Sequence, residues 1–226
     1  MGDLYVTDFK RDENGVVILN RTTFVPQFDN LHPHQTKIGN MNSKWQLGLS
    51  NTVSYKDFQL FFLINGRSGG KVISQTEGVL DQLGFSQRTA DARLSAEANN
   101  IYTTDGRLGM YVHGKPGKNG VEGDYIVAIE DYYNAIGGNA SPAPYVYNAT
   151  NFRLRELSLS YTFRNLIGEN KNLTLSFVGR NLFFLYKDAP VDPDISLSTA
   201  NGLGGFEYFN MPSTRSFGFS AKINYL

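Results

Sequence analysis

Cysteine is absent from this chain of 226 residues, and several other features are missing with it. Without cysteine there is neither a disulfide framework nor a thiolate metal site. The 21 basic residues balance the 21 acidic ones, so no excess positive charge is available to hold a nucleic-acid backbone or an anionic membrane surface. No apolar run is longer than residues 60–64, which excludes a membrane-spanning helix, because such a helix needs roughly 20 apolar residues.

The opening residues MGDL also lack the basic and apolar segments of an export signal. We therefore expect either a cytosolic protein or a chain whose beginning is missing. What the sequence does contain is 16 Phe, 13 Tyr and 23 Gly. This mixture favours strands and turns over helices, so the composition predicts an all-β fold.

Alternation of apolar and polar residues predicts five strands. In Trp45–Tyr55, for example, Trp45, Leu47 and Leu49 fall on one face and Gln46 and Ser50 on the other. The predicted strands are residues 45–55, 58–67, 153–163, 172–184 and 214–226. Only two residues separate the first strand from the second, so we expect a tight hairpin there.

The segments between these strands are unequal in length. Two turns are short, whereas residues 68–150 and 185–213 are long, polar and rich in Gly, Asn, Asp and Pro. If both short turns lie at one end of a sheet, every long segment lies at the other end. Outer-membrane β-barrels have this asymmetry, with short periplasmic turns and long extracellular loops. Within the first long loop, residues 78–94 and 123–136 are expected to form short helices that decorate the surface.

Four stretches together resemble the C-terminal end of SusC/RagA-type TonB-dependent outer-membrane transporters. They are "IGNMNSKWQLGLSNTVSYKDFQLFFLINGRSGG" (38–70), "NFRLRELSLSYTF" (151–163), "LSFVGRNLFFL" (175–185) and "PSTRSFGFSAKINYL" (212–226). The resemblance implies a fold made of the last five or so antiparallel strands of a 22-stranded transmembrane β-barrel, with long extracellular loops carrying short helices. The plug domain, the TonB box and most of the strands of that family are absent from this sequence, so we expect a fragment of a transporter or one piece of a split gene.

The resemblance also implies a function and a location. Members of this family import oligosaccharides, peptides or similar nutrients across the cell outer membrane, under a SusD-like lipoprotein lid and with energy from TonB, ExbB and ExbD. We expect contact with TonB through the missing N-terminal region, contact with outer-membrane lipid, no enzymatic reaction and no cofactor. The predicted organisation is an extracellular loop (1–44), a hairpin (45–67), an extracellular loop (68–150), a hairpin (151–184), an extracellular loop (185–213) and a final strand (214–226).

Two sets of aromatic residues are candidate functional residues. Rings in the predicted loops would stack on sugar faces or peptide side chains, with packing between loops as the alternative. This candidate ligand-binding set is Tyr132, Tyr133, Tyr145, Tyr147, Phe206, Tyr208 and Phe209. Rings near strand ends on the lipid face would form a membrane-interface girdle. This set is Trp45, Tyr55, Phe58, Phe163 and Tyr225.

Two short motifs suggest metal sites, and we expect neither to bind a metal. Asp12, Asn14 and Gly15 fall where the family often has an acidic, calcium-like loop. Cations at positions 10 and 21 stand where carboxylates are needed, so we predict a glycine-assisted turn. The pair His32 and His34 flanks a proline and has no third ligand nearby, which indicates a solvated turn.

Other readings of the sequence remain open at this stage. The first is a soluble β-sandwich that binds carbohydrate, in which the apolar faces of the strands form an internal core. The second is a secreted glycosidase, for which only the carboxylates of Asp188, Asp192 and Asp194 offer candidate acids. No catalytic triad can be assigned, because His113 has no identifiable nucleophile partner.

Overall fold

The computed structural model describes residues 2–29, 36–138, 143–166, 171–195 and 204–225. These residues form two compact units. Unit 1 comprises residues 1–41, 71–147 and 196–210, and unit 2 comprises residues 42–70, 148–195 and 211–226. Each unit is therefore assembled from segments that are distant in the sequence. No helix among the described residues is long and apolar enough to cross a membrane.

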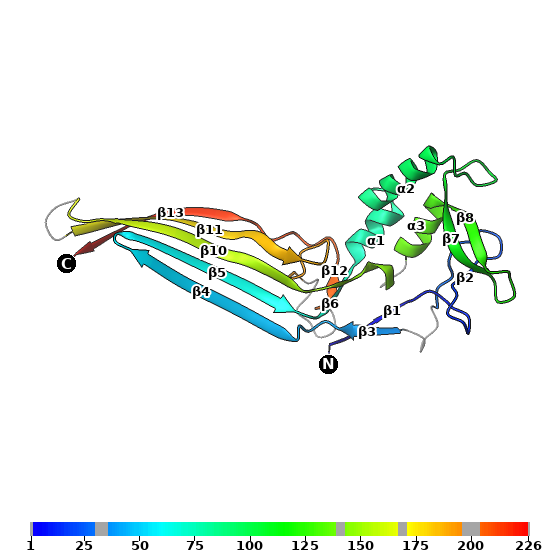
Figure 1. The fold of residues 1–226 in the computed structure, drawn as a ribbon, viewed down its shortest axis with the longest axis horizontal. Helices are drawn as coiled ribbons and strands as arrows, with labels where there is room; N and C mark the ends of the chain where they lie inside the picture. Colours follow the sequence, from blue (N-terminus) through cyan, green and yellow to red (C-terminus); the bar gives the residue numbers. More distant parts are fainter. Residues whose placement is uncertain (1, 30–35, 139–142, 167–170, 196–203, 226) are drawn as a thin grey trace. The chain divides into compact units, whose positions relative to one another are not determined.

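Unit 2 is an antiparallel sheet of five long strands. In sheet order these are β4 (Trp45–Tyr55), β5 (Phe58–Ser68), β10 (Asn151–Phe163), β11 (Lys171–Lys187) and β13 (Ser216–Tyr225), and their labels can be followed in Figure 1. All five strands predicted from the alternation are confirmed. The two expected hairpins, β4–β5 and β10–β11, are both neighbours in the sheet.

The register between β4 and β5 is unbroken, whereas the register of β10 with its two neighbours is interrupted near the start of β10. β4 and β5 pair without a break from Tyr55↔Phe58 to Trp45↔Ser68, across a two-residue turn in which Lys56 has a φ of 54°. On β10, the register shifts between Leu154 and Glu156 toward both neighbouring strands. The residue between them, Arg155, is thus the extra residue of a β-bulge, and a bulge re-aims the side chain that it carries.

Unit 1 mixes short strands with three helices. Its strands are β1 (Asp3–Val6), β2 (Ile18–Leu19), β3 (Thr36–Asn40), β6 (Lys71–Ser74), β7 (Gly109–Pro116), β8 (Gly123–Ala128), β9 (Val146–Asn148) and β12 (Phe206–Glu207). Its helices are α1 (Gln75–Gln82), α2 (Gln87–Ala98), α3 (Ile129–Gly137) and the 3-10 turn η1 (Ala143–Tyr145). The strands form small sheets in the orders β1-β3, β12-β6-β9 and β2-β7-β8. The protein as a whole is mostly β, with its helices in unit 1.

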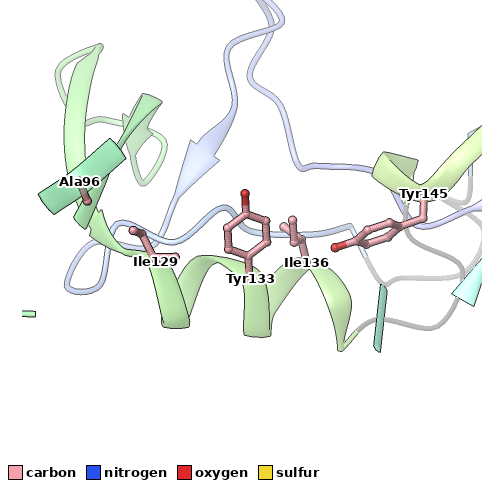
Figure 2. Close-up of a cluster of buried hydrophobic side chains, with 5 residues drawn as sticks. All are labelled: Ala96, Ile129, Tyr133, Ile136 and Tyr145. Carbon is pink, nitrogen blue, oxygen red and sulfur yellow. The ribbon is translucent and has the colours of Figure 1, made fainter. Parts of the chain in front are cut away.

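The core of unit 1 is built around one face of α3. Ile129, Tyr133 and Ile136 are spaced four and three residues apart, so they rise from the same side of the helix, as Figure 2 shows. They join Ala96 of α2 and Tyr145 of η1 in one buried cluster. Tyr145 has no exposed surface, and its hydroxyl donates a hydrogen bond of 2.6 Å to Asp81 Oδ2. Burial and this hydrogen bond raise the pKa of Tyr145 far above its usual value.

Helices α1 and α3 approach each other closely at two glycines. A Cβ atom added to Gly137 would lie 2.2 Å from the carbonyl oxygen of Gly78 and 3.0 Å from Gln82. Gly137→Ala should therefore force the helices apart and lower the stability of unit 1 by about 1–3 kcal/mol. Gly123→Ala is the matched control, because its nearest neighbour would be 3.9 Å away. Thermal unfolding measures both variants, and equal midpoints for the two would contradict this close approach.

The structure corrects the sequence analysis mainly in unit 1. Residues 1–44 were predicted to be a loop, but they contain β1, β2 and β3. Leu4 and Val6 of β1 are buried with Ile73, and this packing stabilises a strand of only four residues. The predicted helix over residues 78–94 is two helices, because Ser86 caps a new helix by accepting a hydrogen bond from Thr89 N.

The second predicted helix is also different in the structure. Residues 123–128 form strand β8, which pairs with β7, and the helix starts only at Ile129. The helices are not surface decoration, since α3 supplies the centre of a hydrophobic core. His32 and His34 lie outside the described residues.

Candidate functional site

One face of the five-stranded sheet is apolar from edge to edge. We call it the apolar face; cross-strand pairing aligns Leu49 with Ile64, Leu159 with Leu60, and Phe177 with both Leu159 and Phe219. Asn51 is a polar exception on this face. The large apolar members of the face are Trp45, Leu47, Leu49, Val53, Tyr55, Phe58, Leu60, Phe62, Ile64, Phe152, Leu154, Leu157, Leu159, Tyr161, Phe163, Leu173, Leu175, Phe177, Phe183, Tyr186, Phe217, Phe219 and Ile223. Alternation along each strand places these side chains together.

The apolar face is not covered by other parts of the described chain. Trp45 is 75% exposed, Phe219 70% and Leu159 51%, and no large apolar side chain of the face belongs to the buried core. Each Å² of apolar surface left in water forgoes about 25 cal/mol. Contiguous exposed apolar patches larger than a few hundred Å² are rare on soluble monomers. The face therefore requires an apolar solvent or partner. This exposure contradicts the β-sandwich alternative, in which the same side chains would form an internal core.

The opposite face of the sheet, which we call the polar face, is lined mainly by small hydroxyl side chains. They include Ser50, Thr52, Ser158, Ser160, Thr162, Thr174, Ser176 and Ser220. Thr162 and Thr174 are hydrogen-bonded across β10 and β11 at 3.0 Å. Phe61 and Leu63 are exceptions on β5. An apolar face opposite a polar face is the arrangement of a wall that separates lipid from an aqueous interior.

The predicted interface residues occupy strand ends. Trp45 and Tyr55 are the first and last residues of β4, Phe58 begins β5, and Phe163 ends β10. Tyr225 ends β13, and its side chain lies outside what the structure describes. Tyr161 lies beside two of these rings and was not predicted. The ring of Tyr161 lies 4.5 Å from that of Phe58 and 4.6 Å from that of Phe163, so the three form one aromatic row. A role at a membrane interface stays a prediction.

The polar face carries a cluster of charged residues at the end of the sheet where the β10 bulge lies. Arg153 is buried, with 2% of its side chain exposed, and its Nη2 lies 2.5 Å from Asp192 Oδ2. Its Nη1 donates to Ser213 Oγ at 2.8 Å, and Ser213 donates to the same carboxylate at 2.6 Å. The guanidinium also stacks over the ring of Phe184 at 3.9 Å. Burial acts to raise the pKa of Asp192, but the hydrogen bonds from Arg153 and Ser213 outweigh it and leave the pKa lowered.

Two further arginines hold the second carboxylate of this cluster. Arg155 Nη2 donates to Asp194 Oδ2 at 3.0 Å, and its Nη1 donates to Asn181 on β11 at 3.1 Å. Arg67 Nε lies 3.3 Å from Asp194 Oδ1. We call Arg67, Arg153, Arg155, Asp192 and Asp194 the arginine cluster. Two of the three carboxylates that a glycosidase would use, those of Asp192 and Asp194, are therefore held in ion pairs with arginines.

The arginine cluster was not predicted from the sequence, although a signal for it exists. Arg153 and Arg155 stand two residues apart, as do Asp192 and Asp194. When a strand and a loop lie side by side, two cations on one and two anions with the same spacing on the other can pair one to one. The pairing joins residues 39 positions apart, so no local rule reveals it.

The candidate ligand-binding aromatics separate into buried and exposed members. Tyr133 and Tyr145 belong to the buried core of unit 1, and Tyr132 and Tyr147 pack against it. Phe206 packs against the second buried cluster, which contains Leu4, Val6 and Ile73. Loop packing, the alternative reading, therefore accounts for these five rings. Tyr208 and Phe209 are about half exposed, and their rings meet edge to face at 5.2 Å.

A turn held by side-chain hydrogen bonds positions Tyr208 and Phe209. Phe209 has a φ of 47°, a conformation that bulky residues seldom adopt. Its backbone N–H donates to Thr76 Oγ1 at 2.6 Å. The buried carboxylate of Glu207 accepts hydrogen bonds from Ser74 and Thr76, both at 2.7 Å. Contact between Tyr208 or Phe209 and a ligand stays a prediction.

The calcium-like stretch forms the turn that was predicted. Asp12 Oδ1 accepts hydrogen bonds from the backbone N–H groups of Asn14 and Val16, and Gly15 has a φ of 83°. The other carboxylate oxygen of Asp12 lies 2.8 Å from Lys115 Nζ on β7. The hydrogen bond from Lys115 is the main cause of the lowered pKa of Asp12. A lysine ammonium thus supplies the positive charge that this carboxylate needs.

His113, the third histidine of the chain, stands between two carboxylates on the β7–β8 hairpin. Its Nδ1 lies 2.8 Å from Asp124 Oδ1, and its Nε2 lies 3.2 Å from Glu122 Oε1. The hydrogen bond with Asp124, followed by that with Glu122, raises the pKa of His113 above its usual value. Both ring nitrogens therefore contact acids, and among the residues that the structure describes neither contacts a serine hydroxyl.

Comparison with known proteins gives one kind of match. No protein-family profile and no curated protein matches the chain. Among solved structures, the chain is similar to the RagAB peptide importer in its "open-open" state, with a TM-score of 0.54 and 15% identity. For the "closed-closed" state of the same importer the TM-score is 0.51 and the identity 14%.

Both matches cover 97% of this chain but only 22% of the importer chain. The chain thus spans about a fifth of the length of the protein that it matches. At these identities the likeness concerns the fold alone. The fold of this chain is that of one part of a RagAB importer chain.

Proposed function

We propose that this chain is part of an outer-membrane, TonB-dependent nutrient importer of the SusC/RagA type. Its five long strands form a section of the wall of a 22-stranded transmembrane barrel. The observation that carries the proposal is the apolar face, which runs across all five strands and has none of its large side chains in a buried core. A bilayer is the apolar solvent that such a face requires, and the polar face then lines an aqueous interior.

The edges of the sheet support the same assignment. β4 and β13 are the two outer strands, and within the described part of the chain each has a neighbour on one side only. In lipid every unpaired backbone N–H or C=O group costs several kcal/mol, so an open edge there favours pairing with a further strand. Five strands cannot close into a transmembrane barrel, because the smallest known barrels of that kind have about eight. The proposal therefore includes partner strands on both sides of this sheet.

The remaining parts of the proposal follow from the family resemblance and from the fold shared with RagAB. Unit 1 belongs to the extracellular part, where Tyr208 and Phe209 contribute to the vestibule that receives oligosaccharides, peptides or similar nutrients. A SusD-like lipoprotein closes this vestibule, and TonB with ExbB and ExbD supplies energy through the N-terminal region of the transporter. The chain has no reaction of its own.

The position of Trp45 gives a direct test of this function. It is the single tryptophan of the chain, lies at the first residue of β4 and belongs to the apolar face. With lipid vesicles added to the refolded chain, we expect its fluorescence to shift to the blue. Bromine atoms near the lipid headgroups should quench it more strongly than bromine atoms near the chain ends, because an interfacial ring lies at headgroup depth.

A second variant supplies the matched comparison. Trp45→Phe combined with Leu159→Trp moves the reporter ring to the middle of β10 on the same face. For this protein the order should reverse, and deeply placed bromines should quench best. If lipid changes neither the emission of the two proteins nor their quenching by acrylamide in water, the sheet does not enter a bilayer and the proposal fails.

A further inference from the structure

We infer that the polar face of the sheet holds a binding site for an organic carboxylate, with Arg67 as its main donor. This inference rests on the proposed function, because the polar face of a transporter wall is where a solute passes. It goes further by naming the chemical group that the wall binds and the residues that bind it.

The site is a cavity of about 260 Å³ on unit 2. Pairing of β4, β5 and β10 brings Gln46, Arg67 and Asn151 into one row across the sheet. Asn65 belongs to the next row on the same face, and Arg155 reaches the cavity from the β10 bulge. The residues that line the cavity are thus mainly polar and come from three strands and the loop that carries Asp194.

The charges around this cavity do not balance. Arg67, Arg153 and Arg155 carry three positive charges, whereas Asp192 and Asp194 carry two negative charges. Arg153 and Asp192 are satisfied by each other and by Ser213. Asp194 is then shared between Arg67 and Arg155, which leaves one positive charge without a partner in the arginine cluster. A bound anion would complete the cluster.

The hydrogen bonds of Arg67 identify where the anion would bind. Its Nε donates to Ala149 O at 3.2 Å and lies 3.3 Å from Asp194 Oδ1. Its two Nη groups have no hydrogen-bond partner among the residues that the structure describes. The side chain is 26% exposed and lines the cavity. Neither Nη atom is buried away from solvent, so a ligand carboxylate that enters the cavity can replace water as the acceptor of these N–H groups.

The geometry of the guanidinium selects among anions. Its two Nη groups form a planar fork that matches the two oxygens of a carboxylate, and such bidentate pairs are among the strongest hydrogen-bonded contacts. The side-chain amides of Gln46 and Asn65 add donors at the same cavity. The volume suits one end of a ligand and not a whole oligomer, since pockets for complete drug-sized ligands begin at about 300 Å³.

The carboxylate has two sources among nutrients, the C-terminus of a peptide and the acid group of a uronic sugar. Isothermal titration of the 226-residue chain in detergent separates them with four probes: triglycine, triglycine amide, glucuronate and glucose. We expect at least one acid to bind, and its neutral counterpart to bind at least tenfold more weakly. Tighter binding of triglycine assigns the site to peptides, and tighter binding of glucuronate assigns it to acidic sugars.

Substitutions then assign the binding to Arg67. Arg67→Gln should weaken the acid by at least tenfold, and Arg67→Lys should restore only part of the affinity, because lysine keeps the charge but not the fork. Arg164→Gln is the control, since Arg164 pairs with Asp57 at the other end of the strands. Circular dichroism checks the fold of each variant.

Several outcomes would overturn the inference. Equal binding of acids and neutral counterparts, absence of binding by all four probes, or an unchanged affinity in Arg67→Gln would each do so. If Arg67→Gln does not fold, the acid-against-neutral comparison on the unchanged chain still decides. Quenching of Trp45 by brominated lipid is measured separately. A chain that enters lipid but does not discriminate acids therefore contradicts this inference and leaves the proposed function intact.

Discussion

Leu159→Arg should destabilise the sheet in a lipid bilayer by about 2–4 kcal/mol, the cost of an arginine near the midplane on the lipid side of a barrel strand. Leu159 lies within β10, the central strand of the sheet, and pairs with Leu60 and Phe177. Its side chain is 51% exposed, so the arginine meets no steric obstacle within the chain. Any loss of stability then shows whether the apolar face is in contact with lipid. Urea titration in vesicles, followed by the fluorescence of Trp45, measures it.

Ser158→Arg is the control for this prediction. Ser158 is the neighbouring residue of the same strand, and its side chain points to the polar face. The same charge and volume should cost about 1 kcal/mol or less there, because that side chain meets water. The two variants should differ by a much smaller amount in detergent-free buffer. Equal effects of the two arginines in vesicles would show that the apolar face does not touch lipid.

The five-stranded sheet was predictable from sequence because its signal is local. Strands of ten to seventeen residues, such as β13 and β11, repeat the alternation enough times to be recognised without knowledge of their partners. Two-residue turns such as that at Lys56 fix which strands are neighbours. The bulge at Arg155 was not predictable, because an extra residue in a ladder is defined only by the strands on either side.

Unit 1 was not predictable, because the signals for its short strands are not local. Its strands β2 and β12 have two residues each and pair with segments far away in the sequence. No periodicity exists in a strand of two residues. The start of α2 could have been found, since Ser86 is a favourable N-cap residue directly after a glycine and a phenylalanine.

Residue type alone also failed to separate two classes of aromatic side chain. Tyr145 is fully buried and donates a hydrogen bond to Asp81, whereas Tyr208 is half exposed on a turn. Both lie outside the long strands and helices, Tyr145 in η1 and Tyr208 directly after β12. The difference depends on Asp81, 64 positions from Tyr145, and on Ser74 and Thr76, which hold the carboxylate of Glu207 from 133 and 131 positions away.

The largest effect of a single substitution on folding is expected at Arg153. Arg153→Met keeps most of the apolar stem but removes the charge that holds Asp192, whose side chain is only 9% exposed. An unpaired buried carboxylate costs far more than the intact pair contributes, so we expect a loss of about 3–5 kcal/mol. Arg164→Met is the comparison, because the Arg164–Asp57 pair is largely exposed and such pairs contribute about 0–1 kcal/mol.

A second substitution distinguishes loss of the pair from loss of packing. In Arg153→Met combined with Asp192→Asn, no unpaired charge remains, and Ser213 still has an amide oxygen to which it donates. The double variant should be more stable than Arg153→Met alone. If the two are equally destabilised, the stacking of Arg153 over Phe184 and not its charge determines the cost. Denaturant unfolding in the same detergent measures all of these variants.

The dependence on pH follows from the same pair. Because the pKa of Asp192 is lower in the folded chain than in the unfolded chain, its contribution is complete above about pH 4 and is lost as the pH falls through the lower, folded value. In Arg153→Met the hydrogen bond that lowers this pKa is gone, so protonation relieves the variant while it harms the original chain. The stability difference between them should therefore shrink on acidification, first above about pH 4 as the variant takes up its proton and then below about pH 4 as the original chain loses its ion pair. A difference that stays constant down to pH 2 would mean that Asp192 is not the partner whose charge matters.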